Sequence, residues 1–153
     1  MVMEEDACKD VEVIKENHEQ SKDAIDEFLR NSRYFIRQMR EISPATLRDL
    51  QKYYPDIWKE QLQAHHAEFT QSIADNLERG MEEGLYRDDL DSEIIANLYT
   101  GMMTMIIDTS VFPAQERTLS QIISQHSKYH FNGIVNQFGR DRLEEYLRQE
   151  ALE

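Results

Sequence analysis

The chain has 153 residues, 40% hydrophobic and 31% charged, which is typical of one globular domain rather than a disordered chain. Its net charge of −13 repels phosphate, so we do not expect the chain itself to bind nucleic acid tightly. Cys8 is the single cysteine, which excludes an internal disulfide and suits the cytoplasm. The acidic N-terminus is unlike a signal peptide, and no apolar stretch is long enough to cross a bilayer. We therefore expect a cytoplasmic protein without membrane contact.

The first predicted element is one long helix that starts near Glu4 or Asp6 and ends near Ile42. Its second half has an apolar stripe with helical spacing, formed by Ile25, Phe28, Leu29, Ser32, Phe35, Ile36 and Met39. Its first half is more charged and has less to pack against. We expect residues 1–42 to form a projecting connecting helix that acts as a lever.

Two proline signals predict the next helices. Ser43 and Pro44 are suited to an N-cap and a first helical position, so a short helix should cover Ala45–Tyr53. Pro55 should open a helix that runs to about Glu83. Its apolar stripe consists of Trp58, Leu62, His65, Phe69, Ile73, Leu77 and Gly80.

A turn and a strongly apolar helix follow. Gly84 stands where a helix end favours positive φ, and Asp91 and Ser92 are candidate N-caps. Between Ile94 and Ile107, apolar residues fall on both faces of the predicted helix. Because a helix that is apolar all round is normally buried, we expect a central helix enclosed by the others.

The last part of the chain predicts two more helices. Thr118 and Gln121 fit a capping box, so a helix should begin there and run to about Asn136. Gly139 should end it, and a short charged helix should follow from Arg140 to Gln149. These elements predict an all-α fold of about six helices in a single domain, 1–153.

Several side chains could carry chemistry, and each also has an ordinary structural explanation. His126 and His130 are spaced i, i+4 and could form half a metal site, but no HExxH or Glu-x-x-His motif accompanies them. We favour the interpretation that the two histidines are polar residues in a contact between helices.

His65 is either a core histidine or a polar group in a ligand pocket. Because no nucleophile motif is present, we expect no enzymatic activity, no catalytic residue and no cofactor.

Methionines concentrate in the apolar helix, at Met102, Met103 and Met105. Methionine fills irregular gaps, so these residues either fill the core or line a pocket that accepts apolar ligands of varied shape. Tyr99, Thr100 and Thr104 could supply the few polar contacts of such a pocket.

Two motifs resemble one family of proteins. The chain resembles the C-terminal domain of TetR/AcrR-type transcriptional regulators in two motifs and the apolar helix after them. The first motif is SPATLRDLQKYYPDIWKE, and the second is NLERGMEEGLYRDDLD. The second motif is more specific, because it combines Glu-x-Gly, a hydrophobic pair, Arg-Asp and a capped helix. The resemblance covers about Ile25 to Tyr146. The basic DNA-binding head of the family has no counterpart here, so either the head is cut away or the protein is a natural headless relative.

The resemblance implies a homodimer that binds a small apolar effector and reaches DNA only through the absent head. A ligand between the first helix and the apolar helix would tilt the lever. The predicted ligand-binding residues are Phe28, Phe35, Met39, Trp58, Leu62, His65, Phe69, Tyr99, Met102, Met103 and Ile106. The predicted dimerisation helices span 117–150, with contacts at Ile122, His126, Tyr129, His130, Phe131, Ile134, Val135 and Phe138. A helical enzyme or metal-binding bundle, and an adaptor without a ligand, are the alternatives.

Overall fold

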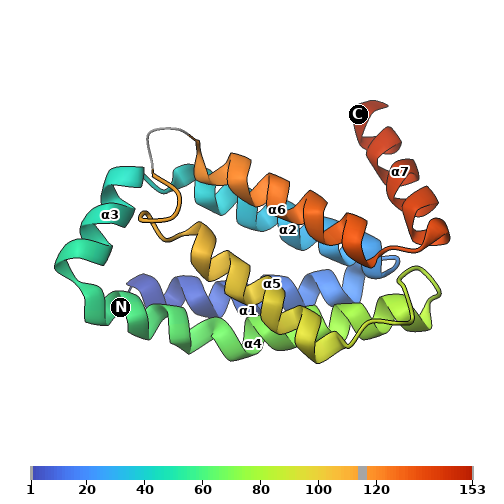
Figure 1. Ribbon diagram of the computed structural model, residues 1–153, viewed down its shortest axis with the longest axis horizontal. Helices are drawn as coiled ribbons and strands as arrows, with labels where there is room; N and C mark the ends of the chain where they lie inside the picture. The colour runs from blue at the N-terminus through green and yellow to red at the C-terminus, as the bar shows by residue number, and fades with distance from the viewer. Residues whose placement is uncertain (1, 114–116, 153) are drawn as a thin grey trace.

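The computed structural model describes residues 2–113 and 117–152, and this part of the chain forms seven helices and no strand. The helices are α1 (Val2–Gln20), α2 (Ala24–Glu41), α3 (Pro44–Tyr53), α4 (Pro55–Glu82), α5 (Ser92–Ile106), α6 (Leu119–Ile134) and α7 (Gln137–Leu152) (Figure 1). The predicted all-α fold is confirmed. The number of helices exceeds the expected six because the predicted first helix is two helices.

The break in the first helix lies at Ser21–Asp23, so the predicted continuous helix over residues 1–42 is wrong. The chain reverses there, and α1 lies antiparallel beside α2 (Figure 1). Asp23 caps α2 by accepting a hydrogen bond from the Asp26 N–H at 2.9 Å. Along the hairpin, the Tyr34 hydroxyl donates to Asp10 at 2.6 Å. Because α1 is held against α2 in this way, it does not project as a lever.

Side chains from α4 and the turn after it bind the backbone groups near this break. The Ala24 carbonyl accepts hydrogen bonds from Asn76 at 2.9 Å and from the Tyr86 hydroxyl at 3.2 Å. Asn76 also donates to the buried carboxylate of Glu27 at 2.6 Å. Arg79 completes an ion pair with Glu27 at 3.4 Å. We call this group the polar anchor; it consists of Asp23, Ala24, Glu27, Asn76, Arg79 and Tyr86.

The glycines of the NLERGMEEGLYRDDLD motif shape the turn that carries Tyr86. Gly84 has a φ of 72°, which confirms the predicted positive-φ helix end. Gly80 has no side chain because the Tyr86 ring occupies that space; a Cβ there would lie 2.0 Å from the ring. The turn thereby places the fully buried Tyr86 against α4 and lets its hydroxyl reach Asn76 at 2.9 Å.

The chain between α6 and α7 differs from the prediction at Gly139. This glycine lies inside α7 and does not end α6, which stops at Ile134. Asn136 marks the start of α7, because its side chain accepts a hydrogen bond from the Gly139 N–H at 2.9 Å. A Cβ at Gly139 would lie 2.0 Å from the Leu85 carbonyl oxygen. The glycine is therefore needed for the close approach of α7 to the turn after α4.

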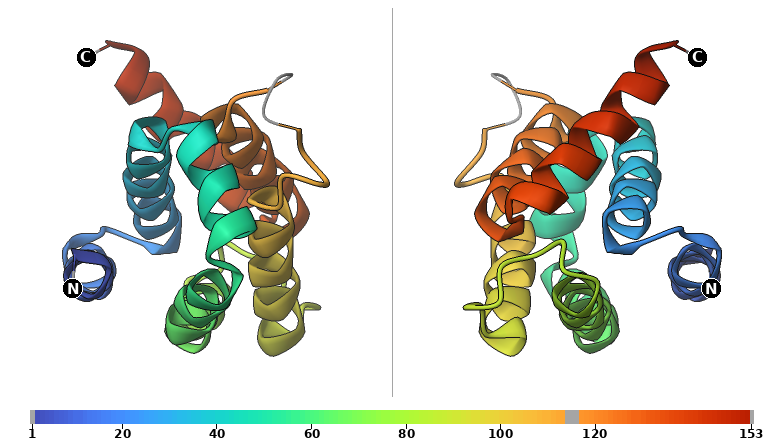
Figure 2. Two further views of the ribbon diagram at one scale, coloured as in Figure 1. Left: turned by 90° about the vertical axis from the view of Figure 1, so that its left-hand side faces the viewer. Right: turned by 90° about the vertical axis from the view of Figure 1, so that its right-hand side faces the viewer.

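The core lies where α2, α4, α5 and α6 meet, and α1 lies outside these four helices (Figure 2). The prediction that α5 is enclosed on every side needs correction. Ala96, Tyr99 and Ile106 are buried, but Ile94 and Leu98 are 58% and 57% exposed. Met105, two turns after Leu98, is also exposed. The apolar residues of α5 therefore cover the core on one side and form an open apolar row on the other.

Candidate functional site

The structure brings four predicted pocket residues together in a cluster of rings. Phe28 of α2 lies 5.8 Å from Tyr99 of α5, between ring centroids. Tyr99 lies 6.1 Å from Phe69 of α4, and Phe69 lies 5.3 Å from Phe35. Phe131 of α6 extends the cluster to the fourth helix, 4.4 Å from Phe28. These rings fill the centre of the bundle and stabilise the contact of all four helices.

The other predicted pocket residues are spread more widely. Five of them are half-buried on α2, α4 and α5, namely Met39, Trp58, Leu62, Met102 and Met103. Ile106 is buried at the C-terminal end of α5 and lines a cavity described below. The side chain of His65 lies outside the described residues.

Two histidines of α6 belong to the ring cluster. The His126 and His130 rings lie 4.4 Å and 4.6 Å from the Tyr99 ring, and His130 stacks on Phe28 at 5.1 Å. We call this group the aromatic–histidine cluster; it consists of Phe28, Phe35, Phe69, Tyr99, His126, His130 and Phe131. In the described part of the chain, both ring nitrogens of His126 and Nε2 of His130 are buried without a hydrogen-bond partner.

Burial determines the protonation of these histidines. It lowers the pKa of His126, because the charged imidazolium loses its hydration. Burial, and secondarily the neighbouring His126, lower the pKa of His130 to about 3. Both rings are therefore neutral at pH 7. A neutral imidazole carries one donor and one acceptor nitrogen, so the pair can bind a neutral polar group.

Hydroxyl groups surround the aromatic–histidine cluster. Ser32 of α2 and Ser127 of α6 are hydrogen-bonded at 3.4 Å, and Thr70 donates to Thr100 at 2.9 Å. Burial raises the pKa of Tyr99, opposed in part by a hydrogen bond with Ser127. The seam between α2 and α6 thus contains polar groups among apolar rings, which is the mixture found in small-molecule sites.

The same seam opens toward the C-terminal end of α2. Because Phe28 contacts Phe131 and Ser32 contacts Ser127, the two helices are antiparallel, and the end of α2 lies beside the start of α6. A groove of about 680 Å³ lies there between Ile36 and Arg40 of α2, the loop residues Phe112 and Arg117, and the first two turns of α6. We call it the arginine groove.

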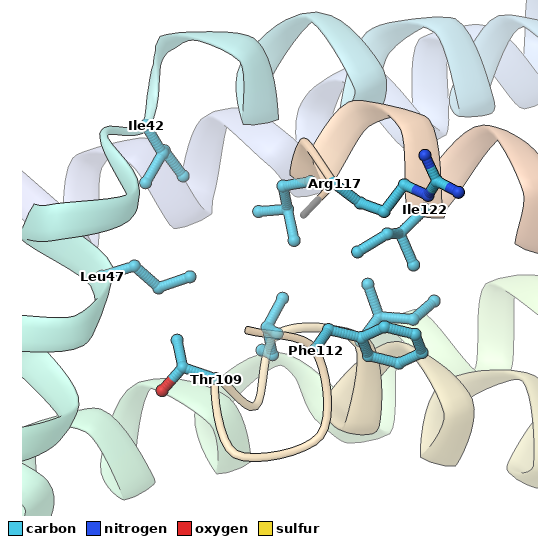
Figure 3. Close-up of a pocket in the computed structure, with 9 residues that line it drawn as sticks. Ile42, Leu47, Thr109, Phe112, Arg117 and Ile122 are labelled. Atoms are coloured by element: carbon cyan, nitrogen blue, oxygen red, sulfur yellow. The ribbon is translucent and has the colours of Figure 1, made fainter. Parts of the chain in front are cut away.

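A small apolar cavity adjoins the arginine groove. Ile42, Leu47, Phe112 and Ile122 converge on it from four segments of the chain (Figure 3). Its volume is about 30 Å³, which leaves room for only a water molecule or two. Ile122 lines both spaces and lies one turn before His126 on α6. The arginine groove and the cavity therefore adjoin each other at the start of α6, one turn before the aromatic–histidine cluster.

The residues predicted for a dimer interface differ widely in exposure. Tyr129 and Phe138 are 72% and 75% exposed, whereas Ile122 is half-buried beside the cavity. The remaining five are buried inside the chain, namely His126, His130, Phe131, Ile134 and Val135. These five stabilise the core of their own chain, so a second copy would have to meet other residues.

Within the described residues, no three His, Cys, Asp or Glu side chains come together as potential metal ligands. No described helix has the length and apolar character required to cross a membrane. No family model, curated protein or solved structure matches this chain. The resemblance to TetR/AcrR-type regulators therefore stays a prediction.

Sequence reasoning missed the arginine groove and the hydroxyl pair of Ser32 and Ser127. Nothing in the sequence distinguishes Arg40 and Arg117 from the other basic residues of the chain, because the packing decides which of them line a groove. The partnerless state of His126 and His130 has no signal in the sequence. It depends on which helices surround α6.

Proposed function

We propose that this chain is an effector-sensing and homodimerising domain, of the kind that TetR/AcrR-type transcriptional regulators carry after their DNA-binding head. The supporting observation is the pair of buried histidines: both ring nitrogens of His126 and Nε2 of His130 have no protein partner within the described chain. Leaving a buried polar group unsatisfied costs roughly 1–3 kcal/mol. A ligand that binds these nitrogens recovers that free energy, so the site favours occupation by a small molecule.

The position of the site suggests how binding would be transmitted. His126 and His130 face Phe28 and Tyr99, so a ligand there separates α6 from α2 and α5. α2 in turn carries α1 through the hairpin. A ligand changes the arrangement of these helices only if it binds two arrangements with different affinity. In a regulator, the changed arrangement of the helices would be transmitted to a DNA-binding head through α1 and α2.

A ligand panel tests this proposal. We expect at least one small apolar compound with a single polar group to raise the unfolding temperature by several degrees, as about 3 kcal/mol of binding would. His126→Phe with His130→Phe should abolish the shift, because the ring nitrogens are lost. His66→Gln is the matched control, since His66 is exposed on α4. A panel of neutral, acidic and basic compounds that leaves the wild type unchanged would contradict effector binding.

The open apolar row on α5 supports the homodimer. Ile94, Leu98 and Met105 lie on one side of the helix, and Gly101 between them adds no side chain that would hold another helix away. An exposed apolar row of this kind marks an interaction surface. Since α5 follows one face of the bundle, a two-fold axis beside it would pair the row with itself.

Light scattering during gel filtration tests the homodimer. We expect the wild type to have the mass of a dimer at micromolar concentration and Leu98→Glu to have that of a monomer, because two buried charges would face each other. Leu147→Glu is the matched control, since Leu147 is exposed on α7 away from the row. A monomeric wild type, or equal dissociation by both substitutions, would count against this surface.

A further inference from the structure

The arginine groove differs in charge from three other open hollows on the described surface. The chain has 30 acidic residues, yet every described side chain that lines the groove is neutral or positive. Carboxylates line each of the three other hollows. Glu83 and Asp141 line one between α4 and α7, Asp88 and Asp89 line a second, and several acidic residues of α4 line the third. Among these four hollows, the arginine groove alone has no described acidic lining residue.

The two arginines of the groove are available to a ligand. No described carboxylate forms an ion pair with Arg40 or Arg117, or with the exposed Arg37 and Arg48 outside the groove. Other arginines, such as Arg30 and Arg79, are paired with neighbouring acids. The guanidinium group binds a carboxylate through two parallel hydrogen bonds, and it is weakly hydrated. Arg40 comes from α2 and Arg117 from the loop before α6, so an anion between them would join the two sides of the seam.

Behind the arginines the groove is apolar. Ile36 and Ile122 line it from the two helices, and Phe112 lines both the groove and the adjoining cavity. Figure 3 shows Phe112 in that cavity, together with Ile42 and Leu47. A volume of about 680 Å³ suits a small organic molecule. The combination of two cations at the edge and apolar side chains inside matches a molecule with an acidic head and an apolar body.

We propose that the effector of this domain is an amphipathic monocarboxylate whose acid group binds Arg40 and Arg117 and whose apolar body follows the α2–α6 seam. This inference rests on the proposed function, because it names the class of effector. The net charge of −13 does not exclude an acid, since salt screens charges beyond about 8 Å at physiological ionic strength. The two nearby arginines then determine the local attraction.

Calorimetry with three matched probes tests the inference: 4-phenylbutyrate, 4-phenylbutanol and 4-phenylbutylamine at physiological salt. They share one apolar body and differ in the charge of the head. We expect the wild type to bind the acid about tenfold more tightly than the alcohol, and the amine most weakly, as a charge-assisted hydrogen bond predicts. Arg40→Gln with Arg117→Gln should remove the preference for the acid. Arg37→Gln with Arg48→Gln changes the net charge equally at exposed positions outside the groove and should retain it.

The outcomes separate the inference from the proposed function. If the alcohol binds as tightly as the acid, and His126→Phe with His130→Phe abolishes both, the inference is overturned while effector sensing stands. If Arg37→Gln with Arg48→Gln weakens acid binding as much as Arg40→Gln with Arg117→Gln does, the net charge of the protein explains the preference for the acid. The inference is then also overturned. If none of the three probes binds the wild type, the carboxylate assignment fails, and the wider ligand panel then decides whether the chain senses any effector.

Discussion

The polar anchor and the aromatic–histidine cluster both include residues from neighbouring turns of α2, but they differ in whether their buried polar groups have hydrogen-bond partners. In the anchor, Glu27, Asn76 and Tyr86 all have hydrogen-bond partners within the chain. In the cluster, three ring nitrogens of His126 and His130 have none among the described residues. A fully satisfied network stabilises a fold, whereas an unsatisfied one reduces stability and leaves binding capacity unused. The contrast shows that the anchor holds the helices, and it supports the proposal that the cluster binds a ligand.

The largest expected effect is at the anchor. Tyr86→Ala removes a fully buried ring from the space over Gly80 and leaves Asn76 without one of its partners. We expect the free energy of unfolding to fall by about 3–5 kcal/mol, as for other aromatic-to-alanine changes in cores. Urea denaturation measures the loss. Tyr53→Ala, at an exposed position, should cost less than about 1 kcal/mol. Similar losses at the two positions would mean that the anchor does not hold the fold.

Asn76→Leu tests the polar part of the anchor. The substitution is close in size but removes the hydrogen bonds to the Ala24 carbonyl, Glu27 and Tyr86. Because each buried group left without a partner costs about 1–3 kcal/mol, we expect a total loss of about 2–4 kcal/mol. The same urea titration measures it. A variant as stable as the wild type would show that these groups find other partners, and the contrast with the cluster would disappear.

The anchor also shows where sequence reasoning ends for this fold. Local signals placed most helix ends: Gly84 has the predicted positive φ, and Thr118 forms the predicted capping box with Gln121. The break at Ser21–Asp23 was missed although its caps are local, since Asp26 accepts a hydrogen bond from the Lys22 N–H and Asp23 accepts one from the Asp26 N–H. The contacts that hold the start of α2 in place come from Asn76 and Tyr86, which bind the Ala24 carbonyl from more than 50 residues later in the chain. Local caps inside a long helical pattern do not reveal such distant partners.

For the candidate site, periodicity identified the apolar faces but not what they meet. Phe28, Phe35, Phe69 and Tyr99 converge because their helical stripes face one core, and their role as pocket residues stays a prediction. The prediction that α5 is enclosed was wrong, since apolar composition does not distinguish a core face from a face left for another molecule. The partnerless histidines and the arginine groove depend on the packing of α2 against α6, and no local pattern encodes it.

Acid should weaken the aromatic–histidine cluster. His130 has a pKa of about 3 in the folded chain and an ordinary value of 6.5 when unfolded, and the pKa of His126 is lowered in the same direction. Below pH 6.5 the unfolded chain therefore binds protons that the folded chain does not. The free energy of unfolding is therefore highest above pH 6.5 and falls as the pH is lowered toward 3. For His130 alone, the loss between pH 7 and pH 5 is about 2 kcal/mol.

A comparison of the wild type with the double variant His126→Phe, His130→Phe isolates the effect of the two histidines on the pH dependence of stability. All other titrating groups are common to the two proteins. We expect the wild type to lose about 2 kcal/mol or more of unfolding free energy between pH 7 and pH 5, relative to the double variant. Urea titrations at the two pH values measure the difference. Parallel pH dependences in the two proteins would show that the histidines are hydrated or paired in solution.

The smallest expected effect has the opposite sign. His126→Leu removes two buried nitrogens that have no partner in the described chain, and it keeps an apolar side chain between Tyr99 and α6. Because no hydrogen bond is lost, we expect the unliganded protein to be unchanged or more stable, by up to about 1 kcal/mol. The comparable change in the anchor, Asn76→Leu, is expected to destabilise. If His126→Leu lowers the free energy of unfolding by more than about 1 kcal/mol at pH 7, His126 has a structural partner and the cluster is part of the scaffold rather than a binding site.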